Sequence, residues 1–336
     1  MGLDRSYYPE VDKMKAFAAL LVILTHILAN YKGDSSIYNF IWEVIHFSVG
    51  AFVFASGFLF GTADPAVNGV KDFFLQLWKK VRRIVIPYWS YAFLYVVFMI
   101  LVGQGGVLLE KMDWAYFLNT VFLLGGVGYT WIPRLFLMLM FTVLVLNWIS
   151  KRNYHAHVAL LIISIFFSSV TLFIDVEIAK KFNMLFGWYL IFISGFFLAK
   201  DYTSLNLRWL AIISTVGTAV LAGFLWLSGL SLSIFHNEYP PTPFFVLFNV
   251  AVVSWLWLWF RRIRMNKVWH SATRWLAHHS YEIFFYHLLV LYVIFDGIRV
   301  NPVFDFVLVT FVTIMLIYAM KGMKLFLWAL LPKKYI

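Results

Sequence analysis

The chain has 336 residues, of which 62% are hydrophobic and 13% are charged, and its formal net charge is +11 at pH 7. A soluble globular domain carries about 25% charged residues, so this composition excludes an ordinary soluble protein and indicates one surrounded by lipid. The absence of cysteine excludes a disulfide, a thiolate nucleophile and a cysteine-bound metal. Membrane topology explains the basic excess more simply than nucleic-acid binding does, so no nucleic-acid partner is expected.

Apolar runs of about 20 residues, the length that a helix needs to cross a bilayer, recur along the whole chain. They predict an all-α polytopic membrane bundle of about ten transmembrane helices, with membrane lipids as its surroundings. The predicted spans are approximately Lys15 to Asn30, Phe40 to Gly61, Ile84 to Val102, Trp131 to Ile149, His157 to Ile174, Met184 to Ala199, Trp209 to Ser228, Pro243 to Phe260, Ser280 to Ile298 and Val303 to Leu331.

The regions between these spans contain no recognisable soluble module. Asp72 to Arg83 and Trp114 to Leu124 are predicted as amphipathic elements that lie in the membrane interface. The last span is long enough to tilt or to break near Lys321. Residues 1–336 are therefore expected to form one integral-membrane domain without a fused soluble domain.

The distribution of basic residues predicts the orientation of the bundle. With the amino terminus inside, the inner segments carry 21 of the 27 Lys and Arg residues. The outer segments carry Lys32, Lys111, Lys180, Lys181 and Arg299, and Arg134 lies within a span. Because cytoplasmic loops collect positive charge, both termini are predicted to lie in the cytoplasm.

His26 lies deep in the first span, eleven residues after Lys15. Eleven residues are about three helical turns, which places both side chains on nearly one face and roughly 16 Å apart along the axis. A cation at the inner mouth with an imidazole further in suits a long donor with an anionic head and a reactive distal end, such as coenzyme A. The alternative is a core histidine whose hydrogen bonds are satisfied, beside a lysine that extends to the interface.

The second span carries Glu43 and His46 near the predicted outer level. Their three-residue spacing places them on one helical face, where a carboxylate could orient an imidazole or act as a second base. A polar cluster at the interface is the alternative. One Glu-x-x-His pair supplies too few ligands for a metal, so none is expected.

Four cations precede the third span: Lys79, Lys80, Arg82 and Arg83. Such a cluster can bind phosphates, and it can equally satisfy the positive-inside bias and anionic lipids. Later candidates are Glu282 and His287 at the start of the ninth span, and Arg134 at the start of the fourth. Arg134 is expected to pair with a carboxylate or to extend to the interface.

Four stretches in chain order resemble the motifs of the membrane-bound acyltransferase type 3 family, whose bacterial members acylate sugars, lipids and exported polymers. They are Val11 to Leu20 with Thr25-His26, Phe52 to Leu59 including Ser56-Gly57, Lys80 to Arg83 with Pro87-Tyr88, and Ser280 to His287. Lys15 and Lys80 stand where the family pattern has arginine, so the charge is kept but the bidentate fork is lost. No Gly-x-Ser-x-Gly nucleophile motif occurs.

The resemblance implies a multi-pass O-acyltransferase of the bacterial inner membrane, with acetyl-CoA or another acyl-CoA as donor and a saccharide or glycolipid hydroxyl as acceptor. It implies that His26 is the base or acyl carrier and that Lys15, Lys80 and Arg83 bind the donor, with Arg82 sharing that task. A transporter or flippase for a sugar or lipid-linked sugar is the alternative. The acceptor, the acyl group and the oligomeric state are not predicted.

Overall fold

The computed structural model describes residues 8–63, 67–104, 106, 110, 112–127, 130–150, 154–173, 177–294 and 299–330. These residues form helices and loops, with one isolated β-bridge between Glu238 and Pro241. The helices are α1 (Pro9–Asn30), α2 (Ser36–Val44), α3 (Phe47–Ala63), α4 (Val70–Leu101), α6 (Trp114–Val121), α7 (Trp131–Ser150), α8 (His155–Val170), α9 (Glu177–Lys200), α10 (Ser204–Leu227), α11 (Pro243–Arg262), α12 (Lys267–His278), α13 (Ser280–Leu289) and α14 (Pro302–Leu330).

Six stretches within the described residues are long and apolar enough to cross a membrane. They are Ser36–Ala63, Val70–Leu101, Trp131–Ile149, Ser204–Leu227, Pro243–Arg262 and Pro302–Gly322, with shorter apolar helices at His155–Val170, Met184–Lys200 and Ser280–Ile294. The chain is therefore a multi-pass helical membrane protein. All ten predicted spans fall on helices, including α1, but the number that crosses the membrane and the orientation of the termini stay predictions.

The centre of the bundle is built on α3 and α9, which approach each other closely. A Cβ added at Gly57 would lie 1.9 Å from the carbonyl oxygen of Phe192, and one added at Gly195 would lie 2.2 Å from that of Phe54. Only glycine fits at such a backbone contact, and small residues are the usual means of tight helix pairing in membranes. Gly57, within the Phe52 to Leu59 motif, therefore allows the close contact between α3 and α9.

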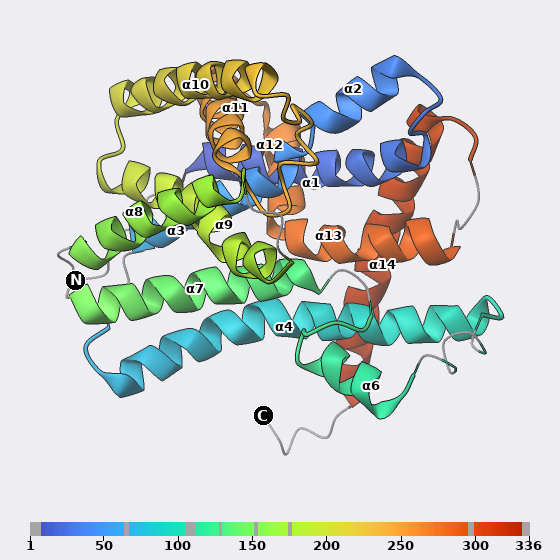
Figure 1. Ribbon diagram of the computed structural model, residues 1–336. Helices are drawn as coiled ribbons and strands as arrows, with labels where there is room; N and C mark the ends of the chain where they lie inside the picture. The colour runs from blue at the N-terminus through green and yellow to red at the C-terminus, as the bar shows by residue number, and fades with distance from the viewer. Residues whose placement is uncertain are drawn as a thin grey trace.

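The other helices surround this pair. In Figure 1, α4 and α7 run side by side at one edge of the bundle, and α10 and α11 form the opposite edge. Helix α1 packs against α3, α11, α12, α13 and α14, so it lies between the two edges. Helix α14 runs steeply past α1 and α13 (Figure 1).

The predicted division between an interfacial element at Asp72 to Arg83 and a span beginning at Ile84 is wrong, because α4 is one continuous 32-residue helix. No turn residue separates Arg83 from Ile84, and Pro87 lies inside the helix. A proline removes only its own backbone donor, a loss that neighbouring groups compensate within membrane helices.

Other boundaries also differ from the prediction. A turn at residues 45–46 separates α2 from α3 within the predicted second span, and Ser280–Leu289 continues into a π-helical turn at Val290–Ile294. Helix α14 continues through Lys321 without a break. The predicted span ends Ile174, Ile298 and Leu331, the predicted outer cation Lys111 and both chain termini lie outside the described residues.

The amphipathic helix α12 was not predicted. Asn266 begins it, since its side-chain oxygen accepts a hydrogen bond of 3.0 Å from the backbone N–H of Trp269. This N-cap is the local signal that marks the start of α12. The helix expected from Trp114 is present as α6, and it begins with an equivalent cap at Asp113. The interfacial position predicted for α6 stays a prediction.

Candidate active site

Two histidines from distant parts of the sequence meet inside the bundle. His26 on α1 and His287 on α13 have ring centroids 5.2 Å apart. The Tyr292 hydroxyl, from the π-helical turn, lies 3.4 Å from His26 Nδ1. His287 is completely buried, whereas His26 keeps some accessible surface. The accessible surface of this pair therefore belongs to His26.

The hydrogen bond of His287 determines which of its nitrogens is basic. Its Nδ1 lies 2.9 Å from the carbonyl oxygen of Ile283, which can only accept, so Nδ1 carries the hydrogen. Its Nε2 is buried and has no hydrogen-bond partner within the described residues. A neutral His287 therefore holds a lone pair on Nε2, inside the bundle and beside His26.

A cluster of positive charge lies toward the amino-terminal end of α1. Lys15 interacts electrostatically with Arg83 of α4, which is exposed, and with Asp12 of its own helix. The structure therefore brings together Lys15 and Arg83. Arg82 is also exposed, and the Nζ atom of Lys80 lies 5.0 Å from the ring centre of Phe60. The electrostatic repulsion between Lys15 and Arg83 favours an anion beside them.

The junction of α12 and α13 borders this cluster. His279 donates from Nδ1 to the carbonyl oxygen of Trp275 at 2.7 Å, and its Nε2 accepts from the ammonium group of Lys321. Glu282 approaches His279 at 3.8 Å. Burial lowers the pKa of His279, and the charge of Lys321 lowers it further. His279 is therefore neutral near pH 7, and the positive charge here is that of Lys321.

His278, adjacent to His279, interacts electrostatically with Lys15. Burial lowers the pKa of His278 first, and the nearby His279 and Lys321 act in the same direction. His278, His279 and Lys321 were not identified from the sequence. The adjacent histidines just before Ser280 were the available signal.

Lys13 has a different role from Lys15, although it is only two residues away. Its Nζ donates hydrogen bonds of 2.7 Å and 2.8 Å to the carbonyl oxygens of Phe260 and Ile263, and its side chain is buried. These carbonyls lie at the carboxyl end of α11, where a cation satisfies otherwise unpaired acceptors. Lys13 therefore connects α1 to α11 and leaves Lys15 directed toward α4.

Helix α2 ends at Val44, and His46 lies in the turn that follows, still close enough to Glu43 for the two to interact electrostatically. The Glu43 carboxylate accepts hydrogen bonds of 2.7 Å from the hydroxyl of Ser233 and 3.0 Å from the backbone N–H of Phe235. His46 lies 2.6 Å through Nδ1 from the carbonyl oxygen of Trp42. Glu43 thus anchors the loop between α10 and α11, while His46 remains close enough to interact electrostatically with His26.

The buried Glu238 in the same loop was not identified from the sequence. Burial raises its pKa to about 8, and the charge of Glu43 acts in the same direction. Arg134, at the start of α7, is exposed. Within the described part of the chain, no group of three or more potential ligands is arranged to hold a metal ion.

A family model described as an acyltransferase domain matches residues 8–322. The chain belongs to the acyltransferase type 3 family. Comparisons with curated proteins and with solved structures found no match. Membership in this family indicates that the chain is a membrane O-acyltransferase, which uses an acyl donor and a hydroxyl acceptor. It gives no support to the transporter alternative.

The matched range includes every candidate residue of this acyltransferase. The structure joins His26 to His287 and Lys15 to Arg83, at different levels of α1. It places Glu43 and His46 with the loop between α10 and α11. Tyr292 was not identified from the sequence, because it lies in a π-helical turn, where the regular helical spacing does not predict which way a side chain faces.

Proposed function

We propose that this acyltransferase moves an acetyl group from cytoplasmic acetyl-CoA to a hydroxyl of a saccharide, glycolipid or exopolysaccharide at or across the bacterial inner membrane. The observation that carries the proposal is the contact between His26 and His287, because His26 lies on the same helix as Lys15, nearer the opposite end. A base inside a water-poor bundle and cations at its mouth are what transfer from a long anionic donor requires.

The donor would bind along α1. Both Lys15 and His26 lie in one unbroken helix, so the eleven-residue separation corresponds to roughly 16 Å at a rise of 1.5 Å per residue. The phosphates of coenzyme A would contact Lys15 and Arg83, with Lys80 and Arg82 nearby on α4. The extended arm would then carry the thioester toward His26.

The two kinds of cation would divide the recognition of the donor. Arg83 offers a planar fork that can hold a phosphate with two hydrogen bonds, whereas Lys15 and Lys80 act as compact charges. Binding would therefore depend more on the summed charge of the cluster than on one bidentate contact. Both termini and these cations would lie on the cytoplasmic side.

The chemical step would use His26 as base. If His26 Nδ1 donates its hydrogen to Tyr292, Nε2 keeps the lone pair. Nε2 takes the proton of the acceptor hydroxyl while the hydroxyl oxygen attacks the thioester carbonyl. The carbon–sulfur bond breaks, and the departing thiolate receives the proton from His26. His287, through its unpaired Nε2, would stabilise the protonated His26 or take its proton.

Glu43 and His46 would act on the acceptor side. Glu43 would keep the loop between α10 and α11 in place, and His46 would contribute to the electrostatic environment of His26. Glu282 would position His279 beside the donor cations. Arg134, exposed at the start of α7, is assigned no contact with donor or acceptor.

The proposal is tested with membranes that contain wild-type protein, His26→Ala or His155→Ala at equal levels. His155 is exposed on α8 and serves as the matched control. Each sample is incubated with labelled acetyl-CoA, and the label is followed into lipid, polysaccharide and protein fractions. Transfer in wild type and His155→Ala but not in His26→Ala is expected. Undiminished transfer by His26→Ala would refute the role of His26, and absence of transfer from acetyl-CoA by folded wild type with native acceptors would refute the donor.

A further inference from the structure

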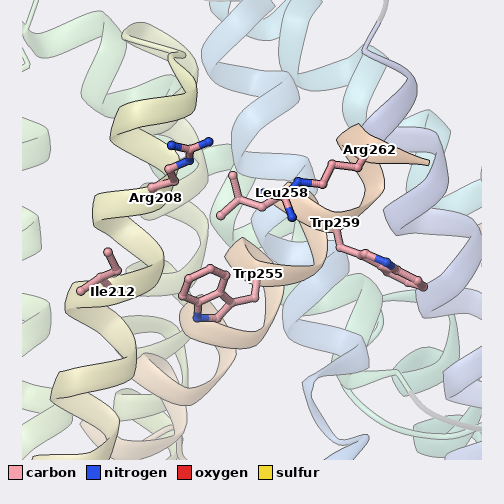
Figure 2. Close-up of a pocket in the computed structure, with 6 residues that line it drawn as sticks. All are labelled: Arg208, Ile212, Trp255, Leu258, Trp259 and Arg262. Carbon is pink, nitrogen blue, oxygen red and sulfur yellow. The ribbon is translucent and has the colours of Figure 1, made fainter. Parts of the chain in front are cut away.

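A mainly apolar pocket with two arginines in its lining lies between helices α10 and α11. Its volume is about 210 Å³, and its lining residues are Arg208, Ile212, Trp255, Leu258, Trp259 and Arg262. Arg208 and Ile212 belong to α10 and the others to α11 (Figure 2). Figure 2 shows both guanidinium groups at the same end of the pocket, near the start of α10 and the end of α11.

Neither arginine is neutralised within the described part of the chain. Arg208 and Arg262 are both exposed, and no carboxylate described there forms an ion pair with either one. Arg261 differs, since its guanidinium lies 5.5 Å from the ring centre of Tyr202. Two uncompensated guanidinium groups facing one space attract an anion, and their planar forks suit the oxygens of a phosphate.

The pocket continues into a larger groove along the same two helices, because Trp255 and Trp259 line both. The larger groove has a volume of about 980 Å³. Its walls are mainly apolar and include Ala219 on α10 and Phe248 on α11. It extends to Glu43, at the opposite end of α11 from Arg262.

The floor and position of this groove also suit a lipid. The indole N–H of Trp255 donates to the hydroxyl of Thr215 at 2.9 Å, so the ring is held across the two helices. Helix α10 packs chiefly against α11 and otherwise forms the edge of the bundle (Figure 1). Trp255 and Trp259 are about half exposed, as expected of indoles between a headgroup region and acyl chains.

We propose that the α10–α11 groove binds an anionic phospholipid, with the headgroup phosphate on Arg208 and Arg262 and an acyl chain along the larger groove. Charge selects the headgroup, and the continuous apolar wall selects a lipid over a small soluble anion. The site shares no residue with the proposed donor cations, so it goes beyond the proposed acyl transfer and does not depend on it.

The test uses the purified full chain in neutral detergent, titrated with phosphatidylglycerol, phosphatidylcholine or inorganic phosphate. Thermal stabilisation gives the apparent Kd. The test variant combines Arg208→Gln with Arg262→Gln. The matched control combines Arg264→Gln with Lys267→Gln, which removes two exposed charges just beyond α11 but outside the groove.

Each arginine near the surface contributes about a fivefold gain in affinity for an anionic lipid, so the test variant should bind phosphatidylglycerol roughly 30-fold more weakly than wild type. The control should bind it like wild type, and phosphatidylcholine should bind weakly to all three. Equal affinity of test and control variants for phosphatidylglycerol would overturn the proposal. Full stabilisation by inorganic phosphate, or by phosphatidylcholine, would overturn it as well.

A second variant keeps the test decisive if the arginine pair is needed for folding. Ala219→Trp fills the larger groove and leaves both arginines in place. It should weaken the binding of phosphatidylglycerol, because the acyl chain loses its place. Unchanged binding would show that the chain does not occupy the groove and would contradict the proposal.

Discussion

Lys13 and Lys15 are two residues apart on α1, and the structure predicts opposite consequences when each is replaced by methionine. The Lys13 ammonium makes two hydrogen bonds to the end of α11, and its side chain is only 9% exposed. A hydrogen bond to a charged group contributes about 1.5–3 kcal/mol, and the two bonds share one ammonium. Lys13→Met should therefore lower the free energy of unfolding by about 3 kcal/mol.

Lys15→Met should leave folding nearly unchanged, because Lys15 stands beside the like charge of Arg83. Its loss should weaken donor binding by about tenfold for each charge-assisted phosphate contact removed. If Lys15 contacts only the remote phosphates, the KM for acetyl-CoA rises while kcat stays close to that of wild type. Lys13→Met should show the reverse pattern, with a normal KM in the fraction that remains folded.

The assay combines thermal unfolding of the purified variants with initial rates of label transfer over a range of acetyl-CoA concentrations. Met is similar in length to lysine, so packing along α1 is largely preserved in both variants. The reasoning is refuted if Lys15→Met unfolds as easily as Lys13→Met. It is also refuted if Lys15→Met has an unchanged KM, since the cation would then not contact the donor.

Three further predictions concern the framework and the outer loop. Gly57→Val should lower the free energy of unfolding by at least about 1–3 kcal/mol, because a Cβ at Gly57 would lie 1.9 Å from the carbonyl oxygen of Phe192 and overpack the contact. Detergent unfolding measures this loss, and wild-type stability would contradict the α3–α9 contact. Raising the pH from 4.5 to about 8 should lower the free energy of unfolding by a few kcal/mol, since the folded state favours protonated Glu238. In Glu238→Gln, thermal stability should change less over this pH range. An unchanged dependence of stability on pH would show that Glu238 is not its cause. Glu43→Gln should increase proteolysis of the loop that holds Ser233 by about tenfold, because a charge-assisted bond of 2.7 Å is weakened; protection equal to wild type would contradict the anchoring role.

Much of the helical framework follows from local sequence. Each of the ten apolar runs of span length falls on helix, because the bilayer requires backbone hydrogen bonds to be satisfied within each helix. The errors occur where local rules compete. The cations from Lys79 to Arg83 look like a boundary but lie within α4, and α12 has too little net hydrophobicity to resemble a span. The turn before Phe47 has no glycine or proline to mark it.

The site was only partly predictable for a similar reason. The relation between Lys15 and His26 depends on one helix and its rise, so spacing alone describes it. The contact between His26 and His287 depends on α1 lying against α13, which no local period specifies. The different partners of Lys13 and Lys15 likewise depend on which helix faces each side of α1.

The central claim is that His26 and His287 act together in acyl transfer, and a double-mutant cycle tests it most directly. Label transfer from saturating acetyl-CoA is measured for His26→Ala, for His287→Ala and for both changes together, with each variant at equal folded level. A general base contributes about 10²–10⁴-fold, and groups that act as a unit are not additive. The account predicts a loss of that size in His26→Ala and no further loss in the double variant. Wild-type transfer by His26→Ala, or losses that multiply in the double variant, would contradict it.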